Sequence, residues 1–177
     1  MVGDGDAIYS REANGAEPSR FDAIVAVIGE TPYSEFFGDL SQGLNQRAPE
    51  TLEHAALHPE DLEVLSRVAG MGKPVVTVFL SGRPLLTTKE LNRSDAFVVA
   101  WLPGTEGAAI AQVLFKGRDG GPARDFTGKL PFSWPAVNCQ SAGDGKAEPL
   151  FPIGYGLGYS DTKDIGPLPE PETSRCD

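Results

Sequence analysis

The chain has 177 residues, of which 40% are hydrophobic and 23% are charged, and these proportions are close to those of globular proteins. This length suffices for one domain with a substantial core, and the composition excludes a wholly disordered chain. Since 15 Lys and Arg face 25 Asp and Glu, the net charge is -10, and neither nucleic acid nor an anionic membrane surface is an expected partner. No apolar run approaches the roughly 18 residues that a membrane-spanning helix needs.

The first part of the chain predicts a connecting segment followed by buried strands. Residues 1–20 are polar and rich in glycine, with a weak strand expected around residues 7–9. Three continuous apolar runs then follow, at 21–29, 74–80 and 96–101. Such runs are typical of strands that are buried on both faces, as in a parallel sheet covered by helices.

Helix signals alternate with these apolar runs. Pro59 with two following acids predicts a helix start, and Gly70 predicts its end. The apolar face of this helix is expected to consist of Leu62, Leu65, Val68 and Ala69. A short helical turn is expected at 87–91 and a second helix at 105–117. The order of the elements predicts an α/β fold, with a mainly parallel sheet and helices on both faces.

The last part of the chain is expected to hold little regular structure. A short edge strand is predicted at 128–134, because Pro131 cannot donate a hydrogen bond to a neighbouring strand. Prolines and scattered acids predict a linker or tail at 161–177. The predicted division is therefore a connecting segment at 1–20, an α/β domain at 21–160, and this tail.

Histidine and cysteine are too sparse to predict a metal centre, and no cofactor is expected. The two histidines, His54 and His58, would share a helix face, but no third ligand accompanies them, so we interpret them as solvated residues near a helix start. Cys139 and Cys176 are too few and too widely spaced for a zinc site. The first six residues are neither basic nor apolar, so no signal peptide is predicted.

The loop after the first apolar run holds the most candidate chemistry. Ligands of open parallel sheets bind outside the carboxyl ends of the strands. Residues 29–39 combine three carboxyl groups, those of Glu30, Glu35 and Asp39, with three aromatic rings. Aromatic rings suit the apolar faces of sugars and disfavour the charged form of a neighbouring carboxyl group, as a general acid requires. Glu35, beside Phe36, is the candidate acid, although such acids can also be solvated or cap turns.

The other strand exits offer weaker candidates. Arg83 would either touch a ligand or form an ion pair with a loop acid. Thr105 is most simply interpreted as a helix cap. Trp101 and Trp134 are expected in the core or at its rim rather than as ligand platforms.

Five sequence blocks in order resemble those of glycoside hydrolase family 3 β-glucosidases and exo-β-glucanases. Each block is modestly specific alone, and the set is highly specific. The blocks are Glu-Thr-Pro-Tyr-Ser-Glu-x-x-Gly-Asp at 30–39, Leu-Ser-Gly-Arg-Pro at 80–84, Ala-Trp-Leu-Pro-Gly-Thr-Glu-Gly at 100–107, Phe-Thr-Gly-Lys-Leu-Pro at 126–131 and Pro-Leu-Phe-Pro-Ile-Gly-Tyr-Gly-Leu-Gly-Tyr at 149–159.

The resemblance implies a fold and a set of roles. The chain is similar to the later part of the family's α/β sandwich, which follows a (β/α)-barrel and shares the active site with it. The resemblance assigns the general acid/base to Glu35 and a structural role to Glu30. Phe36 and Phe37 are expected to line the entrance of the substrate site. The family's nucleophile is an Asp of the barrel, and no matching segment is present in this chain.

The resemblance therefore implies a retaining β-D-glucosidase or exo-β-glucanase that acts on β-glucosides or β-glucans. The barrel domain is the expected partner, the isolated chain is expected to be inactive, and the parent protein is expected in the periplasm or outside the cell. The alternative is a non-catalytic carbohydrate-binding or accessory α/β module. A nucleotide-binding domain is disfavoured because no phosphate-binding loop is present.

Overall fold

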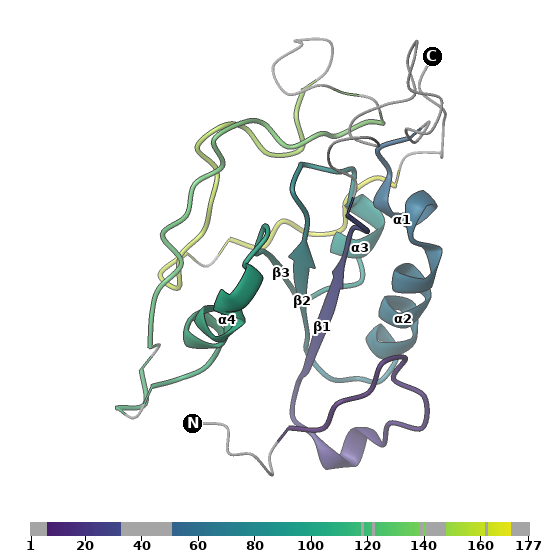
Figure 1. Cartoon of the computed structure of the whole chain (residues 1–177), viewed down its shortest axis with the longest axis vertical. Helices are drawn as coiled ribbons and strands as arrows, with labels where there is room; N and C mark the ends of the chain where they lie inside the picture. Colours follow the sequence, from purple (N-terminus) through teal and green to yellow (C-terminus); the bar gives the residue numbers. More distant parts are fainter. Residues whose placement is uncertain are drawn as a thin grey trace.

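The computed structural model describes residues 7–32, 51–117, 119–121, 123–138, 140, 148–161 and 163–170. Within these residues the centre of the fold is a three-stranded parallel sheet in the order β1-β2-β3 (Figure 1). The strands are β1 (Ile24–Gly29), β2 (Val75–Leu80) and β3 (Ala96–Val99). All three lie within the apolar runs that predicted them, so the parallel sheet is confirmed.

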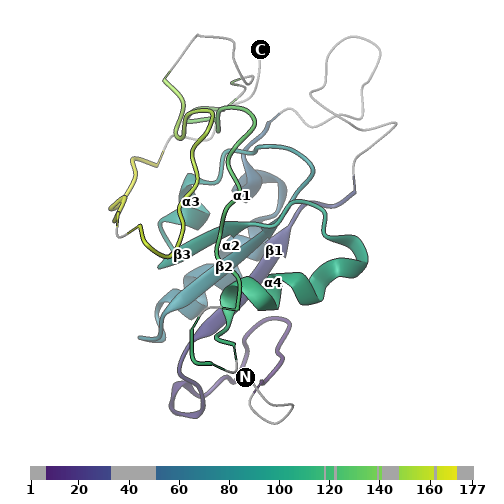
Figure 2. The same ribbon diagram turned by 90° about the vertical axis from the view of Figure 1, so that its left-hand side faces the viewer.

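The helices lie on both sides of this sheet. They are the 3-10 turn η1 (Pro18–Arg20), α1 (His54–Leu57), α2 (Pro59–Ala69), α3 (Thr88–Leu91), the 3-10 turn η2 (Gly104–Glu106) and α4 (Gly107–Leu114). Figure 1 and Figure 2 show α2 on one side of the sheet and α4 on the other. The predicted α/β fold is confirmed, and α1 is a short helix that the sequence pattern did not predict.

The core lies between α2 and the sheet. Leu65 and Val68 of α2 are buried and pack in one cluster with Ile28 of β1 and Phe79 of β2. Ala69, which was expected on this apolar face, is exposed instead. Since Leu65 and Val68 are three residues apart, they lie on the same side of the helix and fix its orientation.

The expectation that every strand is buried on both faces is wrong for β1. Val25 and Val27 are 42% and 61% exposed, whereas Ala26 and Ile28 between them are buried. Successive side chains of a strand point to opposite faces, so only the face toward α2 is covered. On the other side, α4 has no buried residue, and β1 lies at an edge of the described sheet.

Two of the predicted strands do not form in the described residues. Residues 7–9 have no strand, and Ile8 and Tyr9 are exposed. The predicted strand at 128–134 is reduced to a single antiparallel bridge between Trp134 and Phe151. Pro131 has no N–H group to donate, so the pairing of the two segments is interrupted.

Part of the predicted tail lies against α3. The side chain of Asn92 both donates to the carbonyl oxygen of Leu168 and accepts from its N–H group, each at 2.8 Å. Arg93 Nη1 lies 2.9 Å from Glu170 Oε1. Residues 168–170 are therefore held against the domain by the two hydrogen bonds between the Asn92 side chain and the Leu168 backbone and by the ion pair of Arg93 with Glu170.

Gly29 is a position where the sheet tolerates no side chain. It pairs with Leu80 of β2, and an added methyl group would overlap the carbonyl oxygen and Cβ of that residue. We expect Gly29→Ala to lower the free energy of unfolding by about 1–3 kcal/mol, as overpacking does. Denaturant unfolding of the two proteins measures this difference.

The matched control is Gly107→Ala at the start of α4, where an added methyl group meets nothing. Since alanine favours helix, this variant should be neutral or more stable by up to about 1 kcal/mol. If Gly29→Ala were as stable as the unmutated chain, the ends of β1 and β2 would be far enough apart to admit a methyl group.

Candidate active-site region

The carboxyl ends of the three strands lie at one edge of the sheet, because the strands are parallel. The loop predicted to carry the site leaves β1 at this edge. Its candidate residues Glu35, Phe36 and Phe37 lie outside the described residues. The described part of the loop is its stem at 29–32, and the geometry of the region starts from how that stem is held.

Glu30 anchors the stem to the turn that follows β2. Its side chain is 5% exposed, and Oε1 lies 2.8 Å from Arg83 Nη2 and 2.9 Å from Arg83 Nε. The other carboxylate oxygen accepts a hydrogen bond of 2.5 Å from the hydroxyl of Ser81. Of the two alternatives for Arg83, the ion pair with a loop acid is therefore the one that the structure contains. Charge-assisted bonds of this kind are among the strongest in proteins.

Backbone hydrogen bonds join the exits of all three strands. The N–H of Glu30 donates to the carbonyl oxygen of Leu80 at 2.9 Å, and the N–H of Ser81 donates to that of Trp101 at 3.2 Å. Trp101 has a φ of 54°, which is unusual for a residue other than glycine and costs conformational energy. The strand exits are therefore held in register with one another.

Both tryptophans belong to the core and its rim, as predicted. Trp134 is 2% exposed and is part of the core cluster. Its indole N–H donates to the hydroxyl of Thr87 at 3.2 Å. Trp101 is half-buried, and its ring lies 6.1 Å from that of Trp134.

The interpretation of the histidines as solvated residues is wrong for His54. This residue opens α1, and its side chain is completely buried. Nδ1 lies 2.9 Å from Oε1 of Glu90, and Nε2 lies 3.6 Å from Oδ2 of Asp61. The acids on either side of the ring belong to α2 and α3. The spacing of the two histidines in the sequence could not predict these contacts.

Two titratable groups of this cluster have shifted pKa values. Burial alone would lower the pKa of His54, but the hydrogen bond and charge of Glu90, the charge of Asp61 and the Gly29 backbone outweigh it and raise the pKa. Burial raises the pKa of Asp61 against the opposing effects of the Gly29 N–H and the two histidines. The fold therefore favours the protonated imidazole of His54 more than water does.

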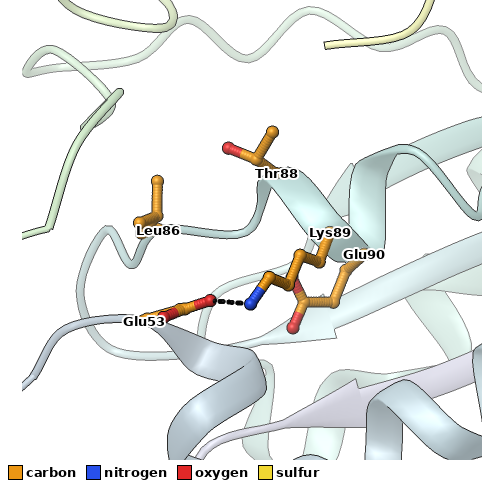
Figure 3. Close-up of a pocket in the computed structure, with 5 residues that line it drawn as sticks. All are labelled: Glu53, Leu86, Thr88, Lys89 and Glu90. Carbon is orange, nitrogen blue, oxygen red and sulfur yellow. Dashed lines mark ion pairs between the residues drawn. The ribbon is translucent and has the colours of Figure 1, made fainter. Parts of the chain in front are cut away.

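A small recess lies beside Glu90 (Figure 3). It is lined by Glu53, Leu86, Thr88, Lys89 and Glu90. Lys89 Nζ lies 2.6 Å from Glu53 Oε1, so one carboxylate of the recess is neutralised. In the described parts of the chain, no three His, Cys, Asp or Glu side chains gather in a way that would hold a metal ion. No helix among the same residues is long and apolar enough to cross a membrane.

The comparisons with known proteins agree with the sequence blocks. A periplasmic β-glucosidase of Salmonella typhimurium is 32% identical over 164 residues, which cover 78% of this chain and 19% of the relative. A lysosomal β-glucosidase of Dictyostelium discoideum is 30% identical over 149 residues, which cover 78% of this chain and 16% of the relative.

Among solved structures, an exo-1,3/1,4-β-glucanase from a Pseudoalteromonas species superposes with a TM-score of 0.76 and 46% identity. The superposition covers 86% of this chain and 18% of that protein. The chain thus spans less than a fifth of the length of each of these three relatives.

The model of the glycosyl hydrolase family 3 C-terminal domain matches residues 9–159. This match includes the stem of the candidate loop, the three strands of the sheet and all five sequence blocks. The chain therefore belongs to the C-terminal domain family of glycosyl hydrolase family 3.

Proposed function

We propose that this chain is the acid/base-bearing part of a retaining β-D-glucosidase or exo-β-glucanase that removes terminal β-glucosyl residues. Its family and the names of its relatives, two β-glucosidases and an exo-1,3/1,4-β-glucanase, support the substrate class. The observation that carries the proposal is the buried anchor of Glu30. It fixes the stem of the loop at the ligand-binding edge of the sheet, five residues before Glu35.

The two glutamates of the loop are not equivalent candidates for the acid. Both carboxylate oxygens of Glu30 are engaged, one by the guanidinium of Arg83 and the other by the hydroxyl of Ser81. Neither oxygen of this carboxylate is available to a substrate. Separating the carboxylate from its buried partners would leave a buried charge uncompensated, which is strongly destabilising. Of the remaining carboxyl groups of the loop, Glu35 and Asp39, we assign the protonation of the leaving oxygen to Glu35, which matches the acid/base position of the family's motif.

The proposed reaction has two steps and uses two carboxyl groups about 5–5.5 Å apart. In the first step, a carboxylate attacks the anomeric carbon while the acid gives its proton to the departing glycosidic oxygen. In the second step, the residue that served as the acid, now a carboxylate, takes a proton from water. The water oxygen bonds to the anomeric carbon, the ester bond between that carbon and the nucleophile breaks, and the sugar leaves. In this proposal Glu35 is the acid/base, and the nucleophile is an Asp of a preceding barrel domain.

We place the α/β domain at 21–160, with residues 1–20 as a connecting segment and residues 161–177 as a linker or tail. The partner of the domain is the barrel of the same polypeptide, and the substrate is a β-glucoside or β-glucan. A relative named as periplasmic supports a periplasmic or secreted parent. No cofactor enters the proposed steps.

The split of the catalytic pair gives the first prediction of this proposal. The chain alone should not hydrolyse an aryl β-glucoside, because an acid without its nucleophile contributes only about 10²–10⁴-fold. Release of the phenol measures the rate, and the whole parent protein is the positive control. Turnover by the chain at the rate of the whole protein would contradict the split site.

The second prediction concerns Glu35→Gln in the whole protein. Since a poor leaving group needs protonation and a good one does not, kcat/KM on a disaccharide should fall by about 10²–10⁴-fold. For 2,4-dinitrophenyl β-glucoside, kcat/KM reports the first step and should fall far less, whereas kcat should also fall because Glu35 is the base of the second step. The control is Glu63→Gln, at an exposed position of α2. Unchanged turnover on both substrates would favour the accessory module instead.

The third prediction concerns the two phenylalanines beside Glu35. If Phe36 and Phe37 line the entrance of the site, they contact the leaving-group sugar rather than the terminal glucose. Phe36→Ala and Phe37→Ala should then change the preference between 1,3- and 1,4-linked disaccharides more than the activity on small aryl glucosides. An equal loss of activity on all of these substrates would contradict the placement of the two rings beside the leaving-group sugar.

A further inference from the structure

The stem of the candidate loop is held from α2 as well as from the β2 turn. Asp61 accepts a hydrogen bond of 3.2 Å from the N–H of Gly29, and Nε2 of His58 accepts one of 3.4 Å from the N–H of Thr31. The N–H of Glu30, which lies between Gly29 and Thr31 in the sequence, donates to the carbonyl oxygen of Leu80. Three successive backbone N–H groups at the exit of β1 are therefore each bound by a different residue of the surrounding fold.

Asp61, His54 and Glu90 form a row of ionisable side chains that leads from the loop stem into the interior of the domain. His54 lies between Asp61 of α2 and Glu90 of α3, at 3.6 Å and 2.9 Å, and both His54 and Glu90 are completely buried. The ring of Phe79 in β2 meets the imidazole edge-on at 5.0 Å. The ring of His58 lies 5.1 Å away. The nearby charges of Glu53 and Lys89 neutralise each other across 2.6 Å.

We propose that His54 is a positioning residue for the acid/base loop: from its buried place between Glu90 and Asp61 it holds the carboxylate of Asp61 against the N–H of Gly29 and so sets the direction in which the loop stem leaves the sheet. This inference rests on the proposed function for the role of the loop. His54 acts on the stem through Asp61 and through its own contact with the backbone of Gly29.

The protonation of the ring decides whether this arrangement attracts or repels. An imidazolium carries a proton on each nitrogen and can face a carboxylate on both sides. When the ring is neutral and Nδ1–H is bonded to Glu90, Nε2 presents a lone pair to the oxygen of Asp61. The loss of one proton therefore converts an attraction across 3.6 Å into a repulsion.

The pKa shift of His54 fixes the pH range of the effect. Since its pKa in the fold is raised above the ordinary value of 6.5, the cation stabilises the fold fully below that ordinary value. This stabilisation is lost as the pH rises through the raised pKa. The stem should therefore loosen on the alkaline side, and not on the acidic side.

Nuclear magnetic resonance of the chain tests the linkage without any activity. The sequence has two histidines, so His58→Gln identifies the ring signals of His54. We expect the His54 ring to titrate above its ordinary pKa of 6.5, and the amide signal of Gly29 to shift with the same midpoint. In Glu90→Gln the midpoint should fall, and in Asp61→Asn the response of Gly29 should weaken to what its direct contact with His54 transmits. A Gly29 amide that is indifferent to the titration of His54 would overturn the inference.

Kinetics of the whole protein supply the second measurement. If His54→Gln and Asp61→Asn misplace the acid, activity on a disaccharide should fall by about 10- to 100-fold, mainly in kcat. The value of kcat/KM on 2,4-dinitrophenyl β-glucoside, which reports the first step without need of an acid, should be nearly unchanged, and the alkaline limb of the pH profile should move. Glu63→Gln on the exposed side of α2 is the control. Equal losses on both substrates would mean a merely structural role and would overturn the inference.

The two proposals fail in different ways. Retained activity of Glu35→Gln refutes the proposed function, whatever the histidine variants do. Inactive Glu35→Gln together with fully active His54→Gln and Asp61→Asn refutes the positioning role alone. If His54→Gln does not fold, Asp61→Asn supplies the comparison. The side chain of Asp61 is 24% exposed, so its replacement should be better tolerated.

Discussion

The ion pair between Glu30 and Arg83 is the interaction on which the rest of the candidate site depends. It joins the exit of β1 to the turn after β2, and the hydroxyl of Ser81 completes the coordination of the carboxylate. Since both side chains are largely buried, removing either partner would leave an uncompensated charge. The pair therefore leaves the stem of the loop few alternative positions, and the sheet fixes the direction in which the loop departs.

A fixed stem matters most when the catalytic groups come from two domains. A proton donor must meet the glycosidic oxygen within hydrogen-bond distance, and small misplacements lower the rate steeply. Arg83 and Ser81 hold the stem on one side, while Asp61 and His58 hold it on the other. In the proposed enzyme, the domain thus carries its acid on an anchored stem, another domain supplies the nucleophile, and His54 with Asp61 and Glu90 makes the anchoring sensitive to pH.

The sequence predicted those features that are encoded locally. Apolar runs identified the strands of the sheet, and Pro59 with its acids identified α2, because strand and helix periodicities are properties of neighbouring residues. The burial of His54 was missed because its partners, Asp61 and Glu90, come from other elements. The exposed face of β1 was missed for a related reason, since a strand pattern does not tell which strand lies at an edge. Glu30 and its partner Arg83 were foreseen only as one of two alternatives.

The assignment of Glu35 as the acid can be tested by one distance in a crystal structure of the whole protein with a bound substrate analogue. We predict that the carboxyl group of Glu35 lies about 5–5.5 Å from an Asp carboxyl group of the preceding domain, across the anomeric carbon, as retention requires. A separation of about 6.5–9.5 Å would instead indicate an inverting enzyme. A Glu35 side chain directed away from the bound sugar would contradict the assignment of the acid altogether.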